Sequence, residues 1–119
     1  MKIDTFSEII NLIDKKQIEK AQFELSKLHI KNKNDPEYLY LRAKIFYLKK
    51  LYYLAVDTLL IALEFSEEDK IYFLLGEIYK FLGQEELSKE IINKSLRVVA
   101  VRNLKETMTG LYRKKSPNL

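Results

Sequence analysis

Apolar residues recur every three or four positions along almost the whole chain, with polar residues between them. This spacing is the period of an amphipathic α-helix. No stretch keeps a strict alternation of apolar and polar residues, and the residue pairs typical of β-hairpin turns are missing, so strands are not expected. The pattern predicts an all-α chain whose helices break near residues 15–16, 32–34, 49–50, Ser66 and Gly83.

Two segments have the features of helix starts. Asp35 precedes Pro36 and Glu37, which is the order of an N-cap, a proline at the first helical position and an acidic residue near the positive end of the helix dipole. Ser66 and the three acidic residues after it resemble a capping box. Helices of about 12–16 residues joined by short loops predict a series of antiparallel hairpins.

A pattern of small and large residues returns after 33 positions. Small residues at a crossing allow two antiparallel helices to approach closely, and large neighbours fill the space beside them. The first copy consists of Leu39, Ala43, Phe46, Ala55, Leu59 and Ala62, and the second of Tyr72, Gly76, Tyr79, Ser88, Ile92 and Ser95. A weaker copy precedes them, so repeats are expected over 2–35, 36–68 and 69–101.

This pattern resembles the tetratricopeptide repeat (TPR). Tyr72, Gly76 and Tyr79 stand at the spacing of that family, and Ala43 replaces the glycine in the second repeat. The first repeat departs from the family, because Ile9 occupies a small position and no aromatic residue stands where tryptophan is usual. The resemblance implies a solenoid of stacked antiparallel helical hairpins, with about three repeats and a closing C-terminal helix.

The end of the chain fits such a closing helix. Val101, Leu104, Met108 and Leu111 recur at helical spacing, as expected of a helix over 101–113 that covers the apolar side of the last repeat. We expect one domain over 1–113 and a flexible basic tail over 114–119. The length of 119 residues suits one domain, and no apolar run approaches the roughly 18 residues of a membrane span.

Charge and composition argue against an enzyme and against nucleic acid as the main partner. The net charge of +4 is concentrated in residues 97–119, so no basic stripe crosses the repeats. The single histidine, His29, has no second histidine or converging carboxylates at metal-ligand spacing, and no phosphate loop or catalytic-serine motif occurs. We expect no catalytic, cofactor or metal site. A cytoplasmic location is expected, because cysteine and a signal peptide are both lacking.

The first helices of the second and third hairpins contain more apolar residues than the hairpin contacts use. In the TPR family these helices line a concave groove that holds a peptide or a partner helix, and aromatic residues are favoured at binding hot spots. The expected partner-binding groove consists of Tyr40, Leu41, Lys44, Tyr47, Phe73, Leu74, Glu77 and Lys80. Tyr40, Tyr47 and Phe73 in particular have no assigned contact inside the repeats.

The expected function is a non-enzymatic adaptor or chaperone-like module that binds an apolar, helical segment of another protein. Relatives that grip a terminal carboxylate use Lys and Asn in the groove, whereas only Lys70 matches here. Three alternatives remain open. The apolar stripe could pair with a second copy in a homo-oligomer, or the aromatic residues could simply belong to the core. The chain also resembles, in size, repeat number and groove character, the TPR chaperones of type III secretion.

Overall fold

The computed structural model describes residues 5–115, and among these the side chains of all but 98, 99 and 105–115. Within this part the chain is helical and forms no strand, which confirms the all-α class. The helices are α1 (Thr5–Asp14), α2 (Ile18–Ser26), α3 (His29–Asn32), α4 (Pro36–Leu48), α5 (Tyr52–Phe65), α6 (Asp69–Phe81) and α7 (Glu85–Lys115).

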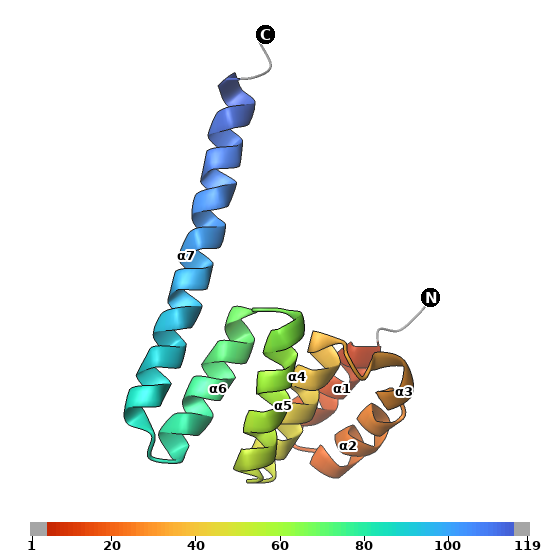
Figure 1. Cartoon of the computed structure of the whole chain (residues 1–119). Helices are drawn as coiled ribbons and strands as arrows, with labels where there is room; N and C mark the ends of the chain where they lie inside the picture. The colour runs from red at the N-terminus through yellow and green to blue at the C-terminus, as the bar shows by residue number, and fades with distance from the viewer. Residues whose placement is uncertain (1–4, 116–119) are drawn as a thin grey trace.

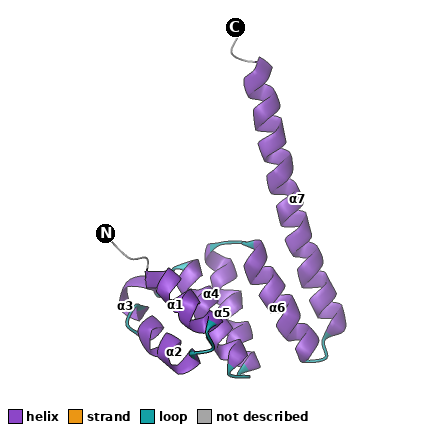
Figure 2. Cartoon of the chain, turned by 180° about the vertical axis from the view of Figure 1, so that it is seen from behind, coloured by secondary structure: helices purple, strands orange, loops and turns teal. Residues whose placement is uncertain are grey.

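Consecutive long helices pack as antiparallel hairpins (Figure 1). The pairs are α1 with α2, α4 with α5, and α6 with the first half of α7. The second helix of each hairpin also contacts the hairpin that follows it, through α2 on α4 and α5 on α6. Seen from behind, the same order is preserved, with loops only at the ends of the helices (Figure 2). The predicted breaks all coincide with the ends of helices, and the short α3 adds one break that the pattern did not predict.

The turn inside each hairpin has the same backbone geometry. Lys16, Lys50 and Gly83 all have a positive φ, between 64° and 79°, and they are 34 and 33 residues apart. After α6, the amide of Gly83 donates to the carbonyl of Lys80 and that of Gln84 to Tyr79, which is the Schellman pattern. The same two bonds close α1 and α4. All three hairpins therefore turn at equivalent positions.

Of the two predicted helix starts, one is confirmed and the other is wrong. Asp35 is the N-cap of α4, and its carboxylate accepts a hydrogen bond of 2.8 Å from the amide of Glu37, as predicted. The predicted capping box at Ser66 is wrong, because Ser66 ends α5 and α6 begins only at Asp69 without a side-chain cap. The hydroxyl of Ser66 instead faces the Glu68 carboxylate at 3.4 Å.

The core consists of two clusters on the two sides of α4. The first lies between the first and second hairpins and includes Tyr38 and Ile45. The second lies between α4, α5 and α6 and includes Leu39 and Ala43, which were predicted to face the hairpin partner. Because α4 contacts α1, α2, α5 and α6, it is apolar on almost every side.

The helix α7 does not end where the sequence predicts the start of a closing helix. Instead, α7 continues through residues 101–113 as one helix of 31 residues. These residues are helical, but the prediction that they form a separate helix that closes the last repeat is wrong. Val101 and Leu104 are 52% and 58% exposed and do not cover the last hairpin. No proline or glycine interrupts residues 85–109, which allows the helix to continue. Lys114 and Lys115 belong to α7, and the rest of the predicted tail, 116–119, lies outside the described residues.

Candidate protein-binding groove

An open groove of about 590 Å³ lies between α4, α6 and the start of α7. We call it the inner groove. Seven of the eight residues expected from the sequence contribute to it. The lining residues are Tyr40, Lys44, Tyr47, Leu48, Lys70, Phe73, Leu74, Glu77, Lys80, Ser88 and Ile92.

Leu41 is the exception, and its assignment to the groove is wrong. The side chain is only 1% exposed and belongs to the core cluster between the first two hairpins. The reason is that α4 packs on α1 and α2 as well as on α5, which places Leu41 toward Ile9 and Ile13. The sequence argument assigned each apolar residue of α4 either to the hairpin partner or to one neighbouring helix, so it could not predict this contact.

The aromatic residues of the groove differ in how far they take part in the core. Tyr40 and Tyr47 are half-buried and pack against core side chains, so the prediction that they lack internal contacts is wrong. Leu74 is 7% exposed and belongs to the core with only its edge on the groove. Phe73 is 43% exposed, and it is therefore the groove residue whose apolar area is most available to a ligand.

An aromatic cluster closes one end of the groove. Phe81 stacks on Tyr52 with ring centroids 5.4 Å apart, and Tyr47 meets Phe81 edge-on at 6.2 Å. Such pairs contribute about 0.5–1.5 kcal/mol beyond the area they bury. Tyr47 also lies 6.0 Å from Tyr52, so its ring contacts two aromatic neighbours at this end of the groove.

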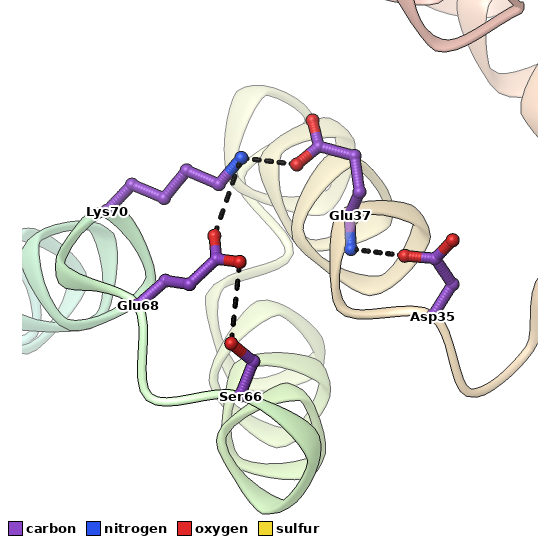
Figure 3. A network of polar contacts seen from close by, with 5 residues as sticks. All are labelled: Asp35, Glu37, Ser66, Glu68 and Lys70. Carbon is purple, nitrogen blue, oxygen red and sulfur yellow. Dashed lines mark hydrogen bonds and ion pairs between the residues drawn. The ribbon is translucent and has the colours of Figure 1, made fainter.

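Lys70 lies at the other end of the groove and joins the starts of α4 and α6 (Figure 3). Its ammonium forms an ion pair with Glu37 and lies 3.8 Å from the carboxylate of Glu68. Burial lowers the pKa of Lys70, but the hydrogen bond and charge of Glu37 and the charge of Glu68 outweigh it, so the pKa lies above its ordinary value. Lys70 thus stays charged and is occupied by contacts within the chain.

The remaining charges of the groove are less well paired. Among the side chains that the structure describes, neither Lys44 nor Lys80 forms an ion pair. Burial raises the pKa of Tyr47, and the negative charge of Glu77 raises it further. Burial also raises the pKa of Tyr40, although the Lys70 ammonium, 4.7 Å from its ring centre, opposes this. Both tyrosines therefore stay protonated near neutral pH and can donate a hydrogen bond to a ligand.

The groove therefore presents exposed apolar surface, two tyrosine hydroxyls and two ammonium groups that form no ion pair with a described side chain, and each of these can contact a bound protein segment. Sequence reasoning did not find Leu48, Ser88 and Ile92 in the groove. Both Ser88 and Ile92 lie close to Gly76 where α6 and α7 cross, since a Cβ atom at Gly76 would meet Ile92 at 2.8 Å. The small residue at this crossing was the sequence signal that could have found them. No group of three or more His, Cys, Asp or Glu side chains that could hold a metal ion occurs in the described part of the chain.

None of the helices within 5–115 is at once long and apolar enough to span a bilayer. His29, considered above as a metal ligand, contacts the hydroxyl of Tyr38 through its Nδ1 atom at 2.9 Å.

No protein-family model, curated protein or solved structure matches the chain.

Proposed function

We propose that this chain is a non-enzymatic protein-interaction module of the TPR type, which acts as a cytoplasmic adaptor or chaperone-like protein. Its inner groove binds an amphipathic helix of a partner protein. The observation that supports this most directly is the groove itself, whose lining includes the exposed Phe73 and two lysines that form no ion pair with a described side chain. The recurrence of the hairpin turns every 33 or 34 residues supports the repeat architecture.

The chemistry of the groove defines the partner. Its apolar residues suit a helix that presents large side chains at three- and four-residue spacing, with one of them packed on Phe73. Lys44 and Lys80 favour acidic residues beside these anchors, because both are positively charged and neither forms an ion pair with a described side chain. A terminal carboxylate is a poorer ligand, since Lys70 is already engaged by Glu37 and Glu68.

A display library of helical peptides, about 20 residues long and varied in apolar and charged positions, tests this proposal. We expect the selection to enrich amphipathic sequences with acidic residues on the flank of the apolar face. In fluorescence anisotropy, the Lys44→Glu/Lys80→Glu variant should bind them at least about 10-fold more weakly.

The matched control is Lys15→Glu/Lys31→Glu, which makes the same change in net charge at two exposed lysines outside the groove. It should bind as the unaltered chain does. Equal losses in the two variants, or enriched peptides that bind both with full affinity, would contradict binding in the inner groove.

A further inference from the structure

The side of α5 that faces away from the core exposes a row of large apolar residues. We call it the outer α5 face. Its residues recur at helical spacing and are between 44% and 75% exposed, whereas the opposite side of the helix is buried. The apolar residues of this face are Tyr53, Leu54, Leu60, Ile61 and Phe65.

The outer α5 face is also acidic. Asp57 and Glu64 are exposed and lie seven residues apart, which places them on the same side of the helix as the apolar row. α5 contains no lysine or arginine, and neither carboxylate forms an ion pair with another described side chain. The face thus combines apolar area with unpaired negative charge.

Single apolar residues on a surface are ordinary, but five on one helix of 14 residues are not. A helix that is apolar on all sides normally has a partner on all sides. The packing of α5 on α4 and α6 accounts for its inner side only. The outer α5 face therefore has the properties of an interface.

The second half of α7 has no helix packed beside it within residues 5–115 (Figures 1 and 2). α7 has 31 residues and α6 only 13, so at about 1.5 Å per residue α7 is longer by about 27 Å. This overhang stands clear of the other helices (Figures 1 and 2). Since most of the stability of a helix in a protein comes from the packing of one of its sides, a contact along the overhang would stabilise it.

The overhang has the charge that the outer α5 face lacks. Arg97 directly before the overhang, and Val101 and Leu104 within it, are exposed and lie on one side of α7 at four- and three-residue spacing. Arg97 forms no ion pair with a described side chain. The overhang itself, residues 98–115, contains five lysines and arginines against one glutamate. Apolar and basic residues on the overhang thus match apolar and acidic residues on the outer α5 face.

We propose that the α7 overhang of one copy docks on the outer α5 face of a second copy. A two-fold arrangement in which each copy contributes both elements closes the assembly as a dimer. The overhang cannot reach the outer α5 face of its own chain, because α7 runs unbroken away from the body on the far side of α6 (Figure 1). The inner groove is a poorer acceptor, because the ammonium groups of Lys44 and Lys80, which form no ion pair with a described side chain, repel a basic helix.

Sedimentation of the full chain over a range of concentrations tests this proposal. We expect a dimer at high concentration and the 14.2 kDa monomer at low concentration. Ile61→Glu should raise the dissociation constant of the dimer at least about 30-fold. The matched control is Phe23→Glu, which places the same charge at a 61% exposed aromatic on α2 and should leave the dimer unchanged.

Charge reversal then tests the pairing of the two elements. The Asp57→Arg/Glu64→Arg variant and the Arg97→Glu/Lys105→Glu variant, whose substituted positions are eight residues apart in α7, should each dimerise at least about 10-fold more weakly, with their helical circular dichroism unchanged. An equal mixture of the two should restore the dimer, because each basic element then meets an acidic one. A monomer at every concentration, or a mixture that does not associate, would overturn the proposal. A dimer that Phe73→Glu dissociates and Ile61→Glu does not would also overturn it, since its interface would be the inner groove.

Discussion

The two hairpins that build the inner groove bring their helices together at equivalent positions but with different residues. In α4–α5 the close contacts are made by three alanines that expose no surface. In α6–α7 the same positions, 33 residues later, are a glycine and two serines. The alanines are Ala43, Ala55 and Ala62, and their counterparts are Gly76, Ser88 and Ser95.

The difference shows that size fixes the crossing while polarity is free to vary. The hydroxyl of Ser88 donates a hydrogen bond of 2.7 Å to the carbonyl of Gly76. The hydroxyl of Ser95 is buried and has no hydrogen-bond partner among the described residues. A buried hydroxyl without a partner costs about 1–3 kcal/mol. The α6–α7 hairpin therefore contains a buried polar group without a hydrogen bond to a described residue, whereas the equivalent positions of α4–α5 contain no polar side chain. Single substitutions in the two hairpins should reveal this difference.

The largest effect is expected where the approach is closest. A Cβ atom at Gly76 would lie 2.8 Å from Cγ1 of Ile92, so the side chain of Gly76→Leu has no space between α6 and α7. We expect this substitution to lower the free energy of unfolding by about 3 kcal/mol, measured by urea denaturation. Gly76→Ala should cost much less, because Ile92 can shift and alanine favours the helix by about 1 kcal/mol. An unchanged denaturation midpoint in Gly76→Leu would show that the helices are not in close contact.

The turns of the same two hairpins should respond in opposite directions. Gly83 ends α6 with a φ of 79°, and Lys50 has a φ of 64° at the equivalent turn. Because a side chain in this conformation costs about 1–2 kcal/mol, Gly83→Ala should destabilise the protein by about that amount. Lys50→Gly should stabilise it by up to about 1 kcal/mol, after the greater freedom of glycine in the unfolded chain is subtracted. Thermal melts of both variants test the pair, and a loss of stability in Lys50→Gly would contradict the geometry of the turn.

Tyr72 should make the free energy of unfolding depend on pH in the alkaline range. Burial raises the pKa of Tyr72 to about 12, and its hydrogen bond to Glu67 and the charge of that residue add to the effect. Since the unfolded pKa is about 10, the stabilisation is complete below pH 10 and is lost as the pH rises from 10 to 12.

Tyr72→Phe should remove this part of the pH dependence. We expect its free energy of unfolding to fall less steeply between pH 10 and 12, by up to about 1.4 kcal/mol per pH unit. Urea denaturation at a series of pH values measures the slope. Parallel curves for the two proteins would show that Tyr72 ionises equally well in the folded and unfolded states.

The two buried serines give the smallest effects and the sharpest contrast. Ser88→Ala removes the bond to the carbonyl of Gly76 and should cost about 1 kcal/mol. Ser95→Ala removes a hydroxyl that has no partner and should leave stability unchanged or raise it by about 1 kcal/mol. Denaturation curves of the two variants should therefore move apart, and equal losses would show that the hydroxyl of Ser95 is also satisfied.

Much of the fold could be predicted from local signals in the sequence. The helical period, the Asp35 cap and the spacing of the small residues gave the helix ends and the hairpin pairs, because each of these depends on residues close in the chain. The position of Leu41 could not be predicted in this way. It depends on how many helices surround α4, which is a property of the packed structure.

The residues that line the groove were predicted more accurately than the contacts that these residues make. All the expected residues except Leu41 line the groove, which also includes residues of α7 that were not expected. Tyr40 and Tyr47 also pack against the core, and Lys70 is engaged by two carboxylates. The outer α5 face was missed, although the all-round apolar character of α5 indicated it. The length of α7 was missed as well, because the repeat pattern placed a boundary where no helix-breaking residue occurs.

The most direct test of the central claim is a titration of one selected helical peptide into Phe73→Ala, paired with a thermal melt of the same variant. Phe73 exposes 43% of its surface, so its truncation leaves no large cavity and should change the melting temperature little. We predict an affinity at least about 30-fold lower than that of the unaltered chain, with Phe23→Ala as the exposed aromatic control that binds normally. Unchanged affinity in Phe73→Ala, or a melting temperature lowered as much as by a core truncation such as Leu59→Ala, would contradict the claim that the inner groove is a binding site.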